Sequence, residues 1–241
     1  MRHLTLWQCL AALGLGLWTA SGLAVQDSVF DAVTDARARA ARDVLENSYR
    51  AYSSEFQEVA TYTREVMHSL IENNRHLYVI KDVDQCQFTP DIENRARLVG
   101  IAPFEYAWGD MLVTGTCVRK DEKLGLSYFE KAVAHGYAPA YMKMASFYER
   151  GYLVPRDTKK AFAYMKTAAQ MGSSLARLGF ADMLIRGYAD EAYYVRAYTW
   201  LYHSVFVDPY QQDKKLYVQG QLEKRMPMNA VAMARASSLG M

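Results

Sequence analysis

The sequence has very little excess of charge of either sign. Its 241 residues include 28 Lys and Arg against 26 Asp and Glu, and the two signs are interspersed along the chain. A formal net charge of +2 gives no electrostatic reason to expect binding to nucleic acid or to an anionic membrane surface. Because 51% of the residues are hydrophobic and 22% are charged, the composition also excludes an intrinsically disordered chain.

Motifs of common catalytic and ligand sites are also missing. The sequence has no glycine-rich loop followed by Lys-Ser or Lys-Thr, no Gly-x-Ser-x-Gly and no Ser-x-x-Lys. The histidines beyond the first 24 residues are not spaced as metal ligands, and we expect each at the surface or in a turn: His68, His76, His135 and His203. We therefore expect no catalytic residues, no cofactor and no metal.

One acidic stretch partly matches a calcium-binding loop. Asp82, Asp84 and Glu93 stand at suitable positions, but Cys86 and Pro90 occupy places where such a loop needs ligands. We expect these carboxylates to cap a helix that begins near residue 91 instead.

Long hydrophobic runs are absent except at the start of the chain. Met1–His3 is short and basic, Leu4–Trp18 is nearly all apolar, and Thr19–Ala24 is small and weakly polar. This order is typical of a secretory signal peptide, and we predict cleavage after Ala24. An uncleaved anchor is the alternative, but a run of about 15 apolar residues is shorter than the roughly 20 that span a bilayer. We expect an exported, soluble mature chain.

Cysteine is scarce. Of the three cysteines, Cys9 lies in the predicted signal peptide, which leaves Cys86 and Cys117 in the mature chain. In an oxidising compartment an even pair favours one disulfide, and two buried free thiols are the alternative.

A gap-free repeat organises the second half of the chain. Phe104–Pro139 aligns with Ala140–Leu175 and with the more degenerate Ala176–Gln211, at a period of about 36 residues. The aligned columns hold small residues, aromatic residues and glycine: Gly109, Ala145 and Ala181; Gly125, Ala161 and Ala197; Tyr128, Tyr164 and Trp200; Gly115, Gly151 and Gly187.

Each unit is predicted to contain two helices. In the second unit, Pro139–Arg150 forms a helix that Gly151 ends, and Asp157 caps a second helix that ends near Gly172. The small columns let paired helices approach closely, while the aromatic column fills the core. Since one such pair cannot bury its apolar face alone, we predict an all-α solenoid of stacked αα-hairpins with a helical N-terminal extension.

The predicted domain boundaries follow from these patterns: signal peptide 1–24, N-terminal helical extension 25–85, capping half-repeat 86–103, repeats 104–139, 140–175 and 176–211, and a C-terminal helical cap and tail 212–241.

Tyrosines outside the repeat columns are candidate interface residues, because exposed Tyr often anchors protein contacts: Tyr141, Tyr152, Tyr188 and Tyr194.

The repeat resembles the Sel1-like repeat, an αα-hairpin relative of the tetratricopeptide repeat. The residues that carry the resemblance are Met144-Ala145, Tyr148, Gly151, Val154, Asp157, Lys160-Ala161, Tyr164, Ala168-Ala169 and Gly172.

Landmarks outside the repeat pattern are similar to the MotX family of motor proteins from sodium-driven polar flagella. They include 70–73, 84–87, 104–106, 115–118 and 222–227. The resemblance implies a non-enzymatic periplasmic protein that forms a ring with MotY around the basal body and helps to retain the sodium-driven stator. It also implies a Cys86–Cys117 bridge. The amino-terminal helical extension formed by residues 25–62 is longer than we expect for this family.

Two other functions stay open at this point. A periplasmic adaptor or regulator of envelope signalling would use the same scaffold. A secreted Sel1-type β-lactam hydrolase would need a nucleophile in a cleft, which the sequence does not reveal.

Overall fold

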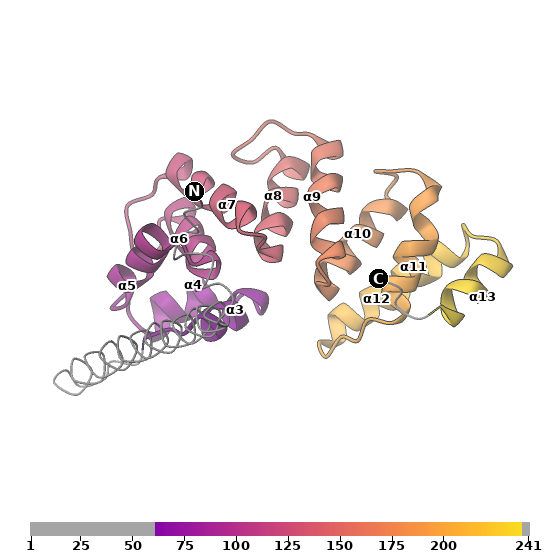
Figure 1. The fold of residues 1–241 in the computed structure, drawn as a ribbon, viewed down its shortest axis with the longest axis horizontal. Helices are drawn as coiled ribbons and strands as arrows, with labels where there is room; N and C mark the ends of the chain where they lie inside the picture. Colours follow the sequence, from indigo (N-terminus) through magenta and orange to yellow (C-terminus); the bar gives the residue numbers. More distant parts are fainter. Residues whose placement is uncertain (1–60, 238–241) are drawn as a thin grey trace, which may run out of the picture. The chain divides into compact units, whose positions relative to one another are not determined.

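The computed structural model describes residues 61–237, and every regular element in that range is helical (Figure 1). The elements in chain order are α3 (Arg64–Glu72), α4 (His76–Tyr78), the π-helical turn η1 (Val79–Val83), α5 (Thr89–Asn94), the π-helical turn η2 (Arg95–Val99), α6 (Ala102–Thr114), α7 (Glu122–Ala134), α8 (Ala138–Arg150), α9 (Thr158–Gln170), α10 (Ser174–Ile185), the 3-10 turn η3 (Glu191–Tyr193), α11 (Tyr194–Tyr202), α12 (Pro209–Glu223) and α13 (Met228–Ala236). The predicted all-α fold is confirmed. The predicted signal peptide and Cys9 lie outside the described residues, as do residues 25–60 of the predicted extension.

Equivalent residues begin and end the helices of successive units. Helices α6 and α8 each have proline in the first turn, and each ends at a glycine in the left-handed conformation, Gly115 (φ 75°) and Gly151 (φ 68°). The side chains of Asp121 and Asp157 accept hydrogen bonds from the backbone N–H groups at the starts of α7 and α9. Proline fits the first turn because it has no backbone N–H, and the N–H groups of that turn have no acceptor within the helix. Glycine adopts the left-handed conformation at the helix end without strain. These signals determine where the two helices of each αα-hairpin begin and end.

Small residues bring the two helices of a pair into close contact. In the first pair, a Cβ atom added to Gly125 would lie 2.7 Å from the Gly109 carbonyl oxygen and 2.6 Å from a methyl carbon of Val113. No side chain fits at that distance, so glycine is required where α6 crosses α7. In the later pairs the equivalent Ala161 and Ala197 are fully buried.

The buried side chains form two hydrophobic clusters that meet at α8. The first contains Phe104, Phe129 and Phe147, and the second contains Phe162 and Phe180 with other side chains from α9 to α13. Helix α8 contributes to both, because its Ala140, Met144 and Phe147 belong to the first cluster and Ala145 belongs to the second. The fold within the described range is therefore two adjacent cores that share one helix.

The leading part of the chain differs from the predicted boundaries. The compact unit begins at Thr61, not near residue 86, and Met67, Ile71 and Ile80 of the preceding helices are buried in the first core. The helix predicted to begin near residue 91 begins at Thr89 and continues into a π-helical turn from Arg95. Tertiary packing of α3 and α4 against α6 is the physical reason, and no local sequence signal indicates it.

At the other end, two helices close the second core. Helix α13 begins directly after Pro227. Val218 and Leu222 of α12 and Ala234 of α13 are buried in the second core.

Candidate functional site

Cys86 and Cys117 form a disulfide that joins two distant parts of the first core. Cys86 precedes α5, and Cys117 lies in the turn between α6 and α7. Their sequence separation is 31, and their Cα atoms are 5.5 Å apart. The bridge therefore attaches the leading helices to the turn of the first repeat.

The residues of the predicted repeat columns lie at the helix contacts. The small residues of both columns are buried in every unit. In the aromatic column Tyr128 is 4% exposed, whereas Tyr164 and Trp200 are half-buried. The Tyr164 ring stacks on Tyr148, with centroids 5.5 Å apart. The columns thus provide packing and hold no reactive group.

The four candidate interface tyrosines are not equally accessible. Tyr152 is 43% exposed, and its ring packs against Phe147. The others are half-buried: Tyr141 contacts the Tyr164 ring, the Tyr188 hydroxyl donates to Glu149 at 3.1 Å, and Tyr194 begins α11. Tyr152 is therefore the most available of the four for a partner.

A buried polar cluster joins α4, α6 and α8. The His76 Nε2 atom lies 2.9 Å from one oxygen of Asp110, and the Lys143 ammonium lies 2.8 Å from the other. His76 is 1% exposed and Asp110 is 3% exposed. The expectation of a surface or turn position for His76 is wrong, because Asp110 on α6 supplies the polar partner that burial of an imidazole requires.

Electrostatics keep Asp110 ionised. Burial acts to raise the pKa of Asp110, but the hydrogen bond from His76 and the neighbouring Lys143 charge outweigh it and hold that pKa below its ordinary value. The adjacent Tyr106 has its pKa raised, first by burial and then by the Asp110 charge, so its hydroxyl remains a neutral donor.

A second buried acid lies in the same core. Glu105 is 2% exposed, and its carboxylate lies 2.8 Å from Nδ1 of His135, whose side chain is half exposed. Like the Asp110 cluster, this pair joins neighbouring helices, here α6 and the end of α7. Neither pair has a nucleophile beside it that would indicate acyl transfer.

The predicted capping role of the acidic stretch is wrong. Helix α5 has Phe88 at its N-cap and no side-chain cap. Asp84 instead accepts a hydrogen bond from the Tyr62 hydroxyl, and Asp91 pairs with Arg95 one turn later. Arg95 also donates to the Tyr62 carbonyl oxygen, so these acids hold the first described residues against η2.

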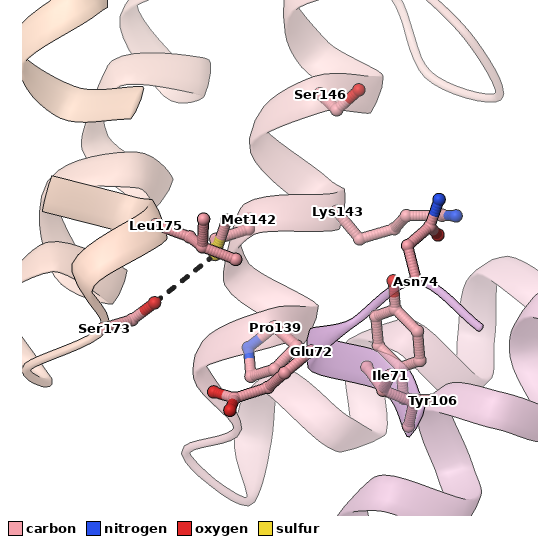
Figure 2. Close-up of a pocket in the computed structure, with 10 residues that line it drawn as sticks. All are labelled: Ile71, Glu72, Asn74, Tyr106, Pro139, Met142, Lys143, Ser146, Ser173 and Leu175. Atoms are coloured by element: carbon pink, nitrogen blue, oxygen red, sulfur yellow. Dashed lines mark hydrogen bonds between the residues drawn. The ribbon is translucent and has the colours of Figure 1, made fainter. Parts of the chain in front are cut away.

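Two cavities of about 260 Å³ each lie along one face of α8. The first is bounded by the end of α3, by Tyr106 of α6, by α8 and by Leu175 of α10 (Figure 2). The second is bounded by α6, by α8 as far as Arg150, and by Tyr152. Lys143 and Ser146 line both cavities.

None of the helices between residues 61 and 237 combines the length and the hydropathy that crossing a bilayer requires.

The comparison with family models supports the repeat. A family model described as the Sel1 repeat matches residues 102–137 and 138–173, two residues earlier in register than the predicted units. A Sel1 repeat protein from Oxalobacter formigenes is similar at 15% identity over 61% of this chain and 96% of that chain, with a TM-score of 0.43. The protective antigen c5321 of uropathogenic Escherichia coli is similar at 17% identity over 74% of this chain and 44% of that one, also with a TM-score of 0.43.

A curated relative extends the similarity beyond the repeats. The sodium-type polar flagellar protein MotX of Vibrio parahaemolyticus serotype O3:K6 (strain RIMD 2210633) is 40% identical over 177 residues, which cover 73% of this chain and 83% of the relative. Identity at that level over most of both chains shows common family membership. With its Sel1 repeats, this chain belongs to the MotX family of sodium-type polar flagellar proteins.

Proposed function

We propose that this protein is a non-enzymatic, periplasmic component of the sodium-driven polar flagellar motor. It forms a ring with a MotY-like protein around the basal body and helps to assemble or retain the stator through the periplasmic part of the stator B subunit. The observation that carries the proposal is the 40% identity to MotX over 83% of that protein. The signal-peptide pattern of residues 1–24 supports export to the periplasm.

The described structure supports a binding role. Its buried acids, Glu105 and Asp110, are engaged in contacts between helices, and its surfaces are those of a helical repeat stack, which suits protein contacts. The protein acts by holding partners, and the ion path belongs to the stator.

A clean deletion in the source organism tests this function. We expect deleted cells to assemble a polar filament but to lose rotation, because stators do not persist at the motor. Electron microscopy of filaments, tethered-cell rotation and the localisation of a fluorescent stator subunit measure the three effects. Complementation with the full gene is the control. Normal swimming of the deletion strain contradicts the proposal and favours the alternative of a periplasmic adaptor for envelope signalling.

A further inference from the structure

Helix α12 carries large side chains on two opposite faces, and only one of these faces is covered. The covered face holds the buried residues of the helix: Lys215, Val218, Gln219 and Leu222. On the opposite face Tyr210 is 76% exposed and Tyr217 is 61% exposed. Two tyrosines at that exposure on one helix face indicate a surface that packs against something outside the described chain.

The exposed face of α12 has the residue spacing of a helix-pairing seam. Its residues follow one another at alternating steps of three and four: Tyr210, Asp213, Tyr217, Gly220 and Lys224. At about 100° per residue these positions fall within about 80° of the helix circumference, opposite the buried face. Alternating steps of three and four are those of the a and d positions through which two helices interlock. We call these five residues the α12 seam.

Gly220 has no reason within the described chain to be glycine. A Cβ atom added there would meet no described atom within 4 Å, whereas at Gly109, Gly125 and Gly179 it would lie within 3.0 Å of another atom. Glycine inside a helix lowers its stability relative to alanine, so a glycine in this place needs another explanation. The absent side chain leaves a recess in the seam that a side chain of another molecule can enter.

The α12 seam is complementary to itself when two copies of the helix run antiparallel. With a two-fold axis passing between positions 218 and 219, Tyr217 of each copy faces Gly220 of the other, and Asp213 faces Lys224. An aromatic ring then enters the recess at glycine, and an acid meets a base, each twice by symmetry. Parallel pairing in register instead places Asp213 against Asp213 and Lys224 against Lys224, which repel each other. The seam therefore specifies the antiparallel direction.

We propose that a second copy of this chain covers the α12 seam, in a two-fold symmetric dimer with the α12 helices antiparallel. A second copy is the occupant because the seam itself supplies both members of each pairing, the ring and the recess, the acid and the base. Leu216, 56% exposed, flanks Tyr217 and adds apolar contact. One pair of 15-residue helices is a small interface, so we expect a dissociation constant in the micromolar range. The dimer goes beyond the proposed function and does not depend on it, since it rests on α12 alone.

Sedimentation equilibrium of the purified mature protein tests the dimer. We expect a monomer–dimer equilibrium for the wild type. Asp213→Lys and Lys224→Asp each replace two attractive charge pairs by two repulsive ones, so each should weaken self-association about tenfold. Glu130→Lys, a charge reversal on the exposed face of α7, is the matched control and should leave the dissociation constant within about twofold.

The two charge variants should bind each other although neither binds well to itself. In the mixed dimer the new lysine faces the new aspartate, and the native Lys224 of one copy faces the native Asp213 of the other. The double variant Asp213→Lys/Lys224→Asp should likewise recover the wild-type dissociation constant. A contact through a different surface would not couple these two positions.

The aromatic pairing is tested by Tyr217→Ser. We expect this change to weaken the dimer about tenfold, because Tyr217 fills the recess at Gly220. The melting temperature measured at concentrations where the protein is monomeric should stay unchanged, since the ring is 61% exposed.

A wild-type protein that stays monomeric at about 0.2 mM overturns the proposal. So does a dimer whose dissociation constant is unchanged in both folded charge variants, because self-association then uses another surface. Failure of the two folded charge variants to associate when mixed overturns the antiparallel pairing. None of these outcomes bears on the motor function, which the deletion strain tests separately.

Discussion

At the scale of single residues, Asp110 has a large predicted effect on stability. Asp110→Ala removes the acceptor of both His76 and Lys143 in the interior of the first core. We expect the free energy of unfolding to fall by about 3 kcal/mol, the lower range for a broken buried pair, because Lys143 keeps partial access to water. Urea denaturation measures it, with the exposed Asp190→Ala as control. Equal midpoints for the two variants contradict the role given to Asp110.

The same carboxylate predicts how stability depends on pH. The pKa of Asp110 is lowered in the folded protein, so the folded state binds this proton less readily than the unfolded chain. The contribution of Asp110 to the free energy of unfolding is therefore complete above its pKa in the unfolded chain, about 3.9. It is lost as pH falls through the pKa of Asp110 in the folded protein. The difference in unfolding free energy between wild type and Asp110→Ala should shrink below about pH 4. A difference that stays constant from pH 7 to pH 3 contradicts this.

The polar residues of the first core were only partly predictable from sequence. Asp110 stands between apolar neighbours on a helix that the repeat pattern places inside the fold, which is a signal of a buried acid with a partner. The identity of that partner is not readable, because His76 lies outside the repeat and 34 positions away.

At the scale of helices, the small columns set how closely a pair can pack. Ala161→Leu places three additional carbon atoms where α9 contacts its partner helix with no exposed surface. We expect a loss of about 1–3 kcal/mol from overpacking. Ala163→Leu, exposed on the same helix, is the matched control and should change stability by less than about 0.5 kcal/mol. Thermal melts of the two proteins make the comparison, and equal losses contradict it.

The disulfide connects two separate segments of the fold, the one before α5 and the turn between α6 and α7. Replacing Cys86 or Cys117 with Ser should lower the unfolding free energy by about 2–5 kcal/mol, since the bridge closes a loop with a sequence separation of 31. Reductant should lower the melting temperature of wild type to that of the Ser variants and leave the variants unchanged. Equal thiol labelling of native and reduced wild-type protein contradicts the bridge.

Helix boundaries in the repeats could be predicted because each depends on a local signal, as Gly151 and Asp157 illustrate. The leading helices could not be predicted in the same way. The π-helical turn at Arg95–Val99 follows from packing and from the contacts of Arg95 with Asp91 and Tyr62. Contacts between residues far apart in sequence leave no periodic pattern in the sequence from which they could be predicted.

At the scale of the whole molecule, we predict that the exported protein begins at Val25. The basic start, apolar middle and small-residue end of residues 1–24 lead to this expectation. Amino-terminal sequencing of the protein from a periplasmic fraction measures it. A membrane fraction that retains Met1 on the protein shows an uncleaved anchor instead.

The sharing of α8 between two cores has a mechanical consequence. Load applied along the stack would concentrate at this shared helix, because each core resists deformation as a packed solid and the boundary between them is the compliant part.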